Sequence, residues 1–578
     1  MTRSERSIAL TGSGGAGAIT AGELLLRLAG AAGGYGLMRR AFGPQIRGGE
    51  AAALLRLGTR PVACMDDAYD LLLALDWRNA ERFAEEVPLR RDSVILADPQ
   101  SGDVPDPIAA SGARVEPLPL AALASEIDGG RPNMVALGAL AALLGLEREP
   151  GADLVASHFL SRGAAVAAAS AGAFRCGYDH LAGQATVRVD PVAWPGDSEA
   201  SSRRWCLTGN EGCGLGALRG GVRFAAAYPI TPASDLLEWL APRLERLGGS
   251  LLQAEDELAS INMVIGASFG GVPSLTATSG PGLSLMLEGL GLAVASETPA
   301  VVIDVMRGGP STGIPTKSEQ ADLDQALHGL HGDAPHLVLG ALDHGDCVRT
   351  TEWATRLAEH LQTVAVVLSD QNLAQSRVIV EPPADGLPTV PPRVVAAPME
   401  AYERYALTDS GVSPMSQPGV PGGMYVADGL EHEPGGRPTT AADVHASQLD
   451  KRARKLEAFD YGPLWAEIGG APSRTAILTW GSSTGAVREA AERLEAGGRP
   501  VRVIALRLLL PARREHLAAA LDGVERVLVV EQSHGRQFYR YLRAHYDLDA
   551  EVRVLARPGP LLFTPGEVVE RIEAWEPA

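Results

Sequence analysis

Four short segments of the chain carry side chains that could bind an anion or move a proton. Each segment follows a predicted strand, and they are centred on Thr231, Glu257, Ser279 and Arg307. Thr231 offers a hydroxyl group, Glu257 a carboxylate, and Arg307 a guanidinium group that can hold a carboxylate in bidentate fashion. Because ligands of an open parallel sheet bind beyond the carboxyl ends of its strands, we expect all four segments to line one crevice.

The segment YPITPAS, residues 228–234, is predicted to form the corner between a strand, FAAAYPI, and a helix, SDLLEWLAPRLERLG. Pro232 suits the first helical position, which puts Thr231 at the N-cap with its oxygen free to accept a helix N–H. Pro229 favours an extended Tyr228. Leucines at helical spacing predict a buried helix face comprising Leu236, Leu237, Leu240, Leu244 and Leu247. The corner is either a plain cap or a place where Thr231 faces a ligand.

Three acids, Glu255, Asp256 and Glu257, stand at the start of the helix predicted in QAEDELASINM. Acids in a first helical turn complement the helix dipole in any protein, so this structural role stays open beside that of a carboxylate aimed at a cofactor nitrogen. The segment TATSGPGLSLM is predicted to run from strand through turn to helix. Backbone N–H groups after Ser279 and Gly280 would then be open at a helix N-terminus, unless the segment is only a connecting turn.

Near the N-terminus, GSGGAG follows the strand predicted at SIALTG and precedes the helix predicted at AITAGELLLRLAGAAG. Its glycines, including Gly12 and Gly14, satisfy the G-x-G-x-x-G pattern, whose backbone N–H groups can hold a phosphate. A dinucleotide site would want an acid about twenty residues further on, where Arg39 and Arg40 stand instead. NADP, another phosphate ligand such as coenzyme A, and a plain glycine turn all stay open. Arg47, in GPQIRGGEA, could meet an anion.

The elements that must position these residues fall into three α/β blocks and one irregular connector. The first block, residues 1–195, also has strand-like runs at RPVACM and DSVILAD and a helical stretch at NMVALGALAALLGL. Residues 196–380 alternate strands and helices in the manner of a parallel doubly wound sheet. Residues 381–470 form a connector rich in proline and glycine, and residues 471–578 alternate strands and helices again.

Composition sets further limits. The net charge of −19 argues against a nucleic acid partner, and no apolar run reaches the roughly 20 residues that a membrane helix needs. The N-terminal segment lacks a signal-peptide cleavage site, so a cytoplasmic protein is expected. The five cysteines include no C-x-x-C pair, so we expect no metal, disulfide framework or iron–sulfur cluster held by this chain alone. Lysine occurs only at Lys317, Lys451 and Lys455, which we ascribe to coding bias.

Segments along nearly the whole chain resemble the 2-oxoacid:ferredoxin oxidoreductase family, and most closely the alpha subunit of the 2-oxoglutarate enzymes. Those similar to the family's pyrimidine-binding domain are GNEGCGLGALRGG, AAYPITPASDLLEW, QAEDELASINMVIGAS, TATSGPGLSLM, DVMRGGPSTGIPTKSEQADL and VVLSDQNLAQSR. TGSGGAGAITAGELL and GPQIRGGEA resemble its gamma domain, fused in front, and LTWGSSTGAVREA and VLVVEQSHGRQ its transketolase C-terminal-like domain. The resemblance implies an α/β protein with three doubly wound or Rossmann-like domains.

The resemblance assigns the residues above to thiamine diphosphate. Glu257, with Glu255 as the alternate, would lie against the pyrimidine ring nitrogen. Thr231 would lie beside the thiazolium ring and the substrate oxygen. Ser279 and Gly280 would contact the same cofactor. The rest of the cofactor corner would comprise Tyr228, Pro229 and Ile230.

The resemblance also assigns residues to the substrates. Arg307, with Thr316, would hold the carboxylate of the 2-oxoacid. The glycine loop with Gly12 and Gly14, and the segment with Arg47, would help to place coenzyme A.

Two parts of the family's site are missing from this sequence. We find neither cysteines for the [4Fe–4S] cluster nor the G-D-G…N pattern that would hold magnesium and the diphosphate. Both belong to the family's beta subunit, so we expect a shared site, activity only with that subunit, and an (alpha–beta)2 heterotetramer. The implied reaction is the reversible CoA-dependent oxidative decarboxylation of 2-oxoglutarate to succinyl-CoA and CO2, with ferredoxin as electron acceptor.

Three alternatives stay open. Pyruvate or branched-chain 2-oxoacids use the same scaffold, so a different substrate is compatible with the resemblance. An NADP- or CoA-binding enzyme could use GSGGAG as its principal site, with YPITPAS and RGGPSTG as mere corners. A non-catalytic scaffold could keep the folds without the chemistry, although the joint presence of Thr231, Glu257 and Arg307 argues against it.

Overall fold

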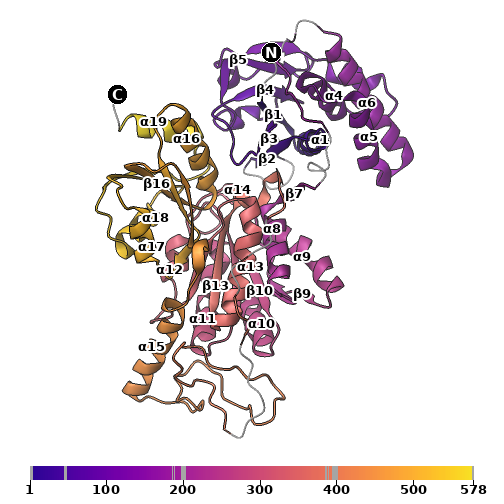
Figure 1. Ribbon diagram of the computed structural model, residues 1–578. Coiled ribbons are helices and arrows are strands. Elements are labelled where there is room, and N and C mark those ends of the chain that lie inside the picture. Colours follow the sequence, from indigo (N-terminus) through magenta and orange to yellow (C-terminus); the bar gives the residue numbers. More distant parts are fainter. Residues whose placement is uncertain are drawn as a thin grey trace. The chain divides into compact units, whose positions relative to one another are not determined.

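A computed structural model describes residues 4–43, 49–184, 187, 189–196, 203–383, 387, 390–393 and 401–575 of the chain (Figure 1). Contacts within the chain divide it into two compact units. Unit 1 comprises Met1–Leu207, Ser376–Pro382 and Thr564–Glu567, and unit 2 comprises Thr208–Gln375, Pro383–Phe563 and Val568–Ala578. The division at residues 195, 380 and 470 stays a prediction.

Unit 1 is built around one mixed sheet. Its strands are β1 (Glu5–Ser13), β2 (Tyr35–Phe42), β3 (Glu50–Gly58), β4 (Tyr69–Ala74), β5 (Leu89–Ala97), β6 (Arg114–Pro117), β7 (Trp205–Thr208) and β14 (Arg377–Val380). Its helices are α1 (Ala18–Ala31), α2 (Asp106–Ala109), α3 (Leu120–Ser125), α4 (Pro132–Leu144), α5 (Arg148–Phe159) and α6 (Ala164–Ala182), with 3-10 turns at Ala80–Phe83 and Leu160–Arg162. The strand order is β6-β5-β4-β1-β3-β2-β14-β7. The strands β1, β4, β5 and β6 are parallel neighbours, whereas β3 is antiparallel to β1 and β2.

The N-terminal elements of unit 1 lie where the sequence predicts them. Strand β1 covers SIALTG, and α1 buries Leu24, Leu25 and Leu28 among its apolar residues. Strand β5 and helix α4 likewise confirm the predictions at DSVILAD and NMVALGALAALLGL. The strand predicted at RPVACM is wrong, because the strand of this region is β3, with the sequence EAAALLRLG. Alanine and leucine favour helices in isolation, and pairing with β1 and β2 overrides that preference here.

Unit 2 contains two sheets. Its strands are β8 (Phe224–Ala227), β9 (Ser250–Gln253), β10 (Ser274–Thr278), β11 (Ala300–Met306), β12 (Leu337–Gly340), β13 (Val364–Asp370), β15 (Ala466–Gly470), β16 (Thr475–Trp480), β17 (Arg502–Leu506), β18 (Leu508–Leu510), β19 (Arg526–Glu531) and β20 (Glu551–Ala556). Its helices are α8 (Gly209–Arg219), α9 (Ser234–Arg246), α10 (Glu257–Phe269), α11 (Gly280–Ala295), α12 (Leu323–His328), α13 (His344–Leu361), α14 (Gln371–Gln375), α15 (Ala442–Glu457), α16 (Thr484–Ala496), α17 (Arg514–Ala520) and α18 (Gln537–His545), with 3-10 turns at Gly462–Trp465 and Gly481–Ser483. Helix α19 (Pro565–Glu573) includes residues assigned to both units.

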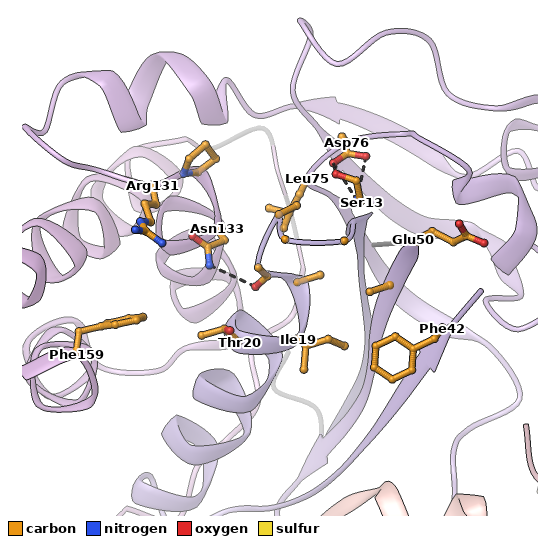
Figure 2. Close-up of a pocket in the computed structure, with 18 of the residues that line it drawn as sticks. Ser13, Ile19, Thr20, Phe42, Glu50, Leu75, Asp76, Arg131, Asn133 and Phe159 are labelled. Carbon is orange, nitrogen blue, oxygen red and sulfur yellow. Dashed lines mark hydrogen bonds between the residues drawn. The ribbon is translucent and has the colours of Figure 1, made fainter. Parts of the chain in front are cut away.

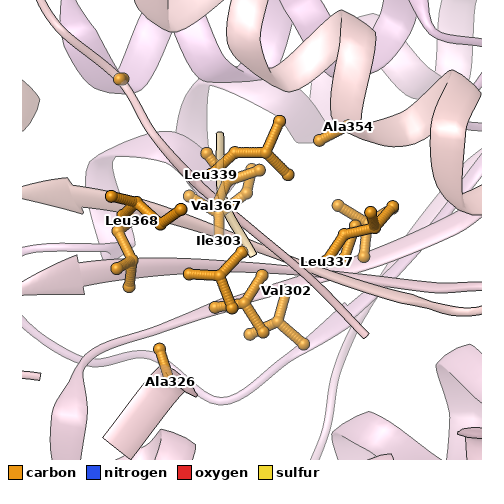
Figure 3. Close-up of a cluster of buried hydrophobic side chains, with 14 of the residues drawn as sticks. Val302, Ile303, Ala326, Leu337, Leu339, Ala354, Val367 and Leu368 are labelled. Carbon is orange, nitrogen blue, oxygen red and sulfur yellow. The ribbon is translucent and has the colours of Figure 1, made fainter. Parts of the chain in front are cut away.

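The larger sheet of unit 2 is almost entirely parallel. Its order is β18-β12-β13-β11-β10-β8-β9, and only β18, at the edge beside β12, runs antiparallel. Figure 3 shows its apolar strand residues, with Ala326 of α12 and Ala354 of α13 on either side. Continuous apolar strands of this kind are typical of a parallel sheet that helices cover on both faces. The carboxyl ends of β8, β10 and β11 therefore open towards one edge of the sheet.

The smaller sheet is formed by the C-terminal part of the chain. Its order is β15-β17-β16-β19-β20, and only β15 runs antiparallel to its neighbour. After β17 the chain continues into β18, which pairs with β12 of the larger sheet. Direct pairing between these two parts of unit 2 fixes the loops of the smaller sheet relative to the larger one. The alternating strands and helices confirm the α/β class predicted for both parts.

The corner at YPITPAS differs from its prediction. Helix α9 begins at Ser234, its N-cap residue is Ala233, and no side chain caps it. The N–H of Ser234 donates to the Ile230 carbonyl instead, at 3.0 Å, and the Thr231–Pro232 peptide bond is cis. Thr231 is therefore not the N-cap, because the chain makes a separate turn before the helix starts. The predicted apolar face of α9 is buried except for Leu247, which is 49% exposed.

The connector contains a helix that the sequence did not reveal. Helix α15 follows a long stretch rich in proline and glycine, and its Lys451 and Lys455 are almost completely buried. Both lysines donate to the Glu297 carboxylate, Lys451 at 2.6 Å and Lys455 at 2.9 Å. We call these three residues the Glu297 cluster. Attributing the rare lysines to coding bias alone is therefore wrong for two of the three, since they fasten α15 to the turn after α11.

Candidate active site

The three acids at the start of α10 have three different environments. Asp256 is the N-cap, and its carboxylate accepts the N–H of Ala259 at 2.7 Å. Glu255 is exposed. Glu257 is the first helical residue and is only 7% exposed. Because Asp256 already caps the helix, capping does not account for the burial of the Glu257 carboxylate.

The Glu257 carboxylate lies against the start of the next helix, α11. A Cβ atom added to Gly282 would come within 2.7 Å of Glu257 Oε1 and 2.0 Å of Thr278 Oγ1, so this position has room only for glycine. Among the residues that the structure describes, the Glu257 carboxylate has no hydrogen-bond partner. Ser279 is the N-cap of α11, yet its buried hydroxyl group caps nothing and has no partner either. These groups fit a ligand that brings its own donors and acceptors.

Arg307 stands directly after β11, as predicted, and is 8% exposed. Its Nη1 donates to the Thr231 carbonyl, which brings the two predicted site residues together. Its Nε is buried and has no partner. Burial lowers the pKa of Arg307, an effect that the nearby Asp322 opposes. A buried guanidinium group without an ion pair among the described residues is suited to an anionic ligand.

Arg307 lines a cavity of about 690 Å³ within unit 2. The walls come from the start of α11, the loop after β11, the segment before α12 and the loop between β19 and α18. The lining residues are Gly280, Pro281, Ser284, Arg307, Gly309, Pro310, Ser311, Glu319, Ala321, Asp322, Gln325, Ser533, His534, Gly535, Gln537 and Pro558. Loops of both sheets thus meet at the carboxyl ends of the β10 and β11 strands, where a parallel sheet binds its ligands.

Three carboxyl groups at this cavity were not predicted from the sequence as site residues. Glu319 and Asp322 line it, and Asp304 lies in β11 just behind, with both of its buried oxygens unpartnered. Burial raises the pKa of Asp304 well above its usual range, and Asp322 adds to the rise. Burial also raises the pKa of Asp322 to about 7, with a further rise from Glu319 and a smaller opposing effect of Arg307. An aspartate inside the apolar strand AVVIDVM was the sequence feature that could have revealed this group.

Of the four residues expected to line one crevice, only Arg307 lines this cavity, together with the predicted Gly280, whereas Thr231, Glu257 and Ser279 are not among its lining residues. Thr316 is buried but is not among the lining residues. Tyr228 is 42% exposed, Pro229 is exposed and Ile230 is partly buried. The corner therefore offers its side chains to the surface of unit 2, while its Thr231 carbonyl faces Arg307.

A second cavity of about 690 Å³ surrounds the glycine loop of unit 1 (Figure 2). Gly14 lines it, whereas Gly12 belongs to β1 and an added Cβ there would touch Ala16 and Leu75. Gly17 is the N-cap of α1 with φ 89°, a backbone conformation that favours glycine, and no side chain caps the first N–H groups of this helix. Arg47 lies outside the described residues.

The glycine loop is held from two sides, and arginines stand at its cavity. The Asp76 carboxylate accepts the Ser13 N–H and hydroxyl, at about 3 Å, and Asn133 Nδ2 donates to the Gly17 carbonyl at 3.3 Å. Arg131 and Arg162 line the same cavity and are exposed. Open N–H groups at a helix start, together with two arginines, provide the chemistry that binds phosphate groups.

Within the part of the chain that the structure describes, no group of three or more His, Cys, Asp or Glu side chains is arranged to hold a metal ion. No helix there is both long and apolar enough to cross a membrane.

Two protein-family models match the chain. The one described as "Pyruvate flavodoxin/ferredoxin oxidoreductase, thiamine diP-bdg" matches residues 215–451. The other, described as "Pyruvate ferredoxin/flavodoxin oxidoreductase", matches residues 7–180. The first match covers the corner, Glu257 and Arg307, and the second covers the glycine loop.

Individual relatives agree with these matches. The chain is 34% identical to the 2-oxoacid:ferredoxin oxidoreductase subunit alpha of Saccharolobus solfataricus over 388 residues, which are 64% of this chain and 61% of that relative. It thus spans less than two thirds of that relative's length. It is 32% identical to the 2-oxoglutarate synthase subunit KorA of Methanothermobacter thermautotrophicus over 64% of this chain and 98% of that protein.

A solved structure matches almost the entire chain. It is the 2-oxoglutarate:ferredoxin oxidoreductase from Magnetococcus marinus with 2-oxoglutarate, coenzyme A and succinyl-CoA bound. The TM-score is 0.91 at 36% sequence identity, and the match covers 99% of both chains. Together with the nearly complete coverage of the methanogen relative, this similarity shows that the chain belongs to the 2-oxoacid:ferredoxin oxidoreductase family.

Proposed function

We propose that this chain is the alpha subunit, with a fused gamma region, of a 2-oxoglutarate:ferredoxin oxidoreductase. The complex would convert 2-oxoglutarate and coenzyme A into succinyl-CoA and CO2, pass two electrons singly to ferredoxin, and also run in reverse. The observation that carries this proposal is the match along 99% of both chains to an enzyme whose structure holds that oxoacid, coenzyme A and the acyl product. The same match favours 2-oxoglutarate over pyruvate and branched-chain 2-oxoacids.

The residues at the start of α10 and α11 fit the pyrimidine ring of thiamine diphosphate. The buried Glu257 carboxylate has room beside it because Gly282 lacks a side chain, and the Ser279 hydroxyl is unpartnered. When bound, thiamine diphosphate supplies the carbon nucleophile that adds to the keto carbon and stabilises the charge left when CO2 departs. Glu257 would hold a proton on the pyrimidine ring, whereas Glu255 is too exposed for this role.

Arg307 is the residue of this chain suited to hold a carboxylate of the 2-oxoacid. Its hydrogen bond to the Thr231 carbonyl orients the guanidinium group and leaves Nε available. Thr231 would face the reacting oxygen from the corner. Tyr228, Pro229 and Ile230 are proposed contacts because they directly precede Thr231 in the chain. Thr316 is a proposed contact because it lies in the segment that follows Arg307.

Coenzyme A would use the glycine loop of unit 1. The open N–H groups after Gly17 suit a phosphate, and Arg131 and Arg162 add positive charge that the sequence did not single out. Gly14 would contact the ligand directly, and Gly12 would support the loop. Arg47 stays a proposed contact.

A beta subunit would complete the site. It would bring magnesium, the diphosphate contacts and the [4Fe–4S] cluster, in a cytoplasmic (alpha–beta)2 heterotetramer, and ferredoxin would dock near that cluster. Large apolar side chains exposed on β9, α10 and α11 support a protein partner on this part of unit 2, because such residues are enriched at interfaces. They include Leu252, Leu258, Met263 and Leu285.

The test uses this chain co-purified with its beta partner under anaerobic conditions. Reduction of a viologen dye would be followed with coenzyme A and, in turn, 2-oxoglutarate, pyruvate and 2-oxoisovalerate. Reduction with 2-oxoglutarate, with succinyl-CoA identified by mass spectrometry, is the expected result. Preference for another oxoacid would change the substrate. No reduction with any of them, by a complex that holds thiamine diphosphate and an intact cluster, would overturn the proposal.

A further inference from the structure

The cavity beside Arg307 has three carboxyl groups in or behind its wall, which is unfavourable for a site that binds an anion. Glu319 and Asp322 line it and Asp304 lies behind, while Arg307 is its one buried cation among the described residues. If all three carboxyl groups were ionised, the wall would be negatively charged and would repel a carboxylate ligand. For such a ligand to bind beside Arg307, some of these groups must be protonated.

Asp322 is the one of these three carboxyl groups that both lines the cavity and acts electrostatically on Arg307. A Cβ atom added to Gly280 would lie 2.5 Å from Asp322 Oδ1, so the carboxyl group packs on the first turn of α11. Its Oδ2 is buried and unpartnered. Among the described residues, Asp322 forms no ion pair with Arg307, whose Nη1 is instead bonded to the Thr231 carbonyl. The guanidinium group is therefore left for a ligand.

We infer that Asp322 is a further substrate-binding residue of the 2-oxoacid pocket, and that the pocket takes the substrate carboxylate only while Asp322 is protonated. This inference rests on the proposed function, because it assigns the cavity to the oxoacid. A neutral Asp322 can donate its proton to the ligand beside Arg307. An ionised Asp322 repels the ligand and competes with it for the guanidinium group.

The surrounding charges set the pH at which this change occurs. Burial raises the pKa of Asp322 to about 7, and Glu319 raises it further, whereas Arg307 lowers it. Burial, and then the nearby Asp322, hold the pKa of Asp304 well above its usual range. Other charged groups nearby, among the described residues, include His534, which acts on Glu319, and the pair of Asp324 with Arg540. The Glu531 carboxylate accepts hydrogen bonds from the backbone N–H groups of Phe538 and Tyr539.

The sign of the pH effect follows from these shifts. The anionic ligand binds the protonated form, so affinity is complete below the pKa of Asp322 and is lost as the pH rises through it. If only that form binds, KM for the oxoacid rises about tenfold for each pH unit above the pKa. The value of kcat at saturating oxoacid should not follow this change, because substrate binding compensates for the loss of protonated enzyme.

The test measures KM and kcat for 2-oxoglutarate between pH 6 and 9, at saturating coenzyme A, in the complex with the beta subunit. In the parent complex KM should be flat at low pH and climb above about pH 7. Asp322→Asn should abolish the climb. Glu319→Gln should move it to lower pH, because it removes a charge that raises the pKa of Asp322. Asp324→Asn, at a partly exposed acid two positions away that does not line the cavity, is the matched control and should keep the parent profile.

The outcomes separate this inference from the proposed function. Turnover with a KM that does not change with pH would overturn this inference and leave the proposed function standing. The same holds if KM of Asp322→Asn rises with pH as it does in the parent. If Asp322→Asn does not fold, an unshifted climb in Glu319→Gln would overturn it equally. Absence of turnover with every oxoacid and at every pH would overturn the proposed function, and this inference with it.

Discussion

Removing the charge of Glu297 tests how helix α15 of the connector is held to the rest of unit 2. In Glu297→Gln, Lys451 and Lys455 would lose a carboxylate that accepts from both, at 2.6 and 2.9 Å, in a fully buried site. Arg404 is also buried beside them and donates to the backbone carbonyl of Glu297. The substitution would therefore leave three neighbouring buried cations without the Glu297 carboxylate as counter-charge. Breaking a buried ion pair by removing one partner costs about 3–5 kcal/mol.

Hydrogen exchange of the α15 amides measures this cost locally. A loss of about 3 kcal/mol corresponds to a fall in protection of a little over a hundredfold at neutral pH. The deficit should shrink as the pH rises towards 8. Burial already lowers the pKa of Lys455 to about 8 in the parent, and loss of Glu297 would lower it further. The unfolded state then binds more protons than the folded variant, so the variant gains stability with rising pH.

Two results would refute this reasoning. Glu457→Gln, at the exposed end of the same helix, is the matched control and should leave protection unchanged. Equal protection of α15 in Glu297→Gln and in this control would show that the cluster does not fasten the connector. A double variant, Glu297→Gln with Lys455→Met, should lose less than the sum of the single changes, and strict additivity would also contradict the account.

Three further predictions concern the proposed site. Gly282→Ala should weaken thiamine diphosphate binding at least about tenfold in a fluorescence titration of the complex, because the new methyl group would lie 2.7 Å from Glu257 Oε1. Arg307→Lys should raise KM for the oxoacid about tenfold or more in the dye assay, since an ammonium group cannot reproduce the bidentate fork. Arg131→Ala and Arg162→Ala should each raise KM for coenzyme A several-fold, on the order of 1 kcal/mol, and leave KM for the oxoacid unchanged. Unchanged constants in any of these variants would contradict the corresponding assignment.

The sequence predicted the elements of the site better than the contacts between them. Strand–turn–helix patterns at residues 8–31 and 274–295 gave both glycine-rich helix starts correctly. The N-cap at Thr231 was wrong because the chain turns at Ile230 and Ser234 before α9 begins. The sequence shows which residues favour a helix start, but the tertiary bond from Arg307 to Thr231 is not local and leaves no sequence pattern.

The partners of the buried charged residues also could not be predicted from the sequence. Asp304 was visible as an acid within an apolar strand, whereas its proximity to Asp322 depends on how the segment before α12 folds back. Lys451 and Lys455 were visible as rare residues, but their partner Glu297 lies about 150 positions away. Charge pairing over such separations follows from the fold and not from spacing.

The most direct test of the central claim compares two acids two positions apart. Glu257→Gln and Glu255→Gln would each be co-purified with the beta subunit and assayed for viologen reduction with 2-oxoglutarate and coenzyme A. The account predicts that Glu257→Gln lowers kcat by about 10²–10³-fold, while the exposed Glu255→Gln stays near the parent rate. Full turnover of Glu257→Gln, in a complex that holds thiamine diphosphate and its cluster, would show that this chain does not supply the catalytic carboxylate.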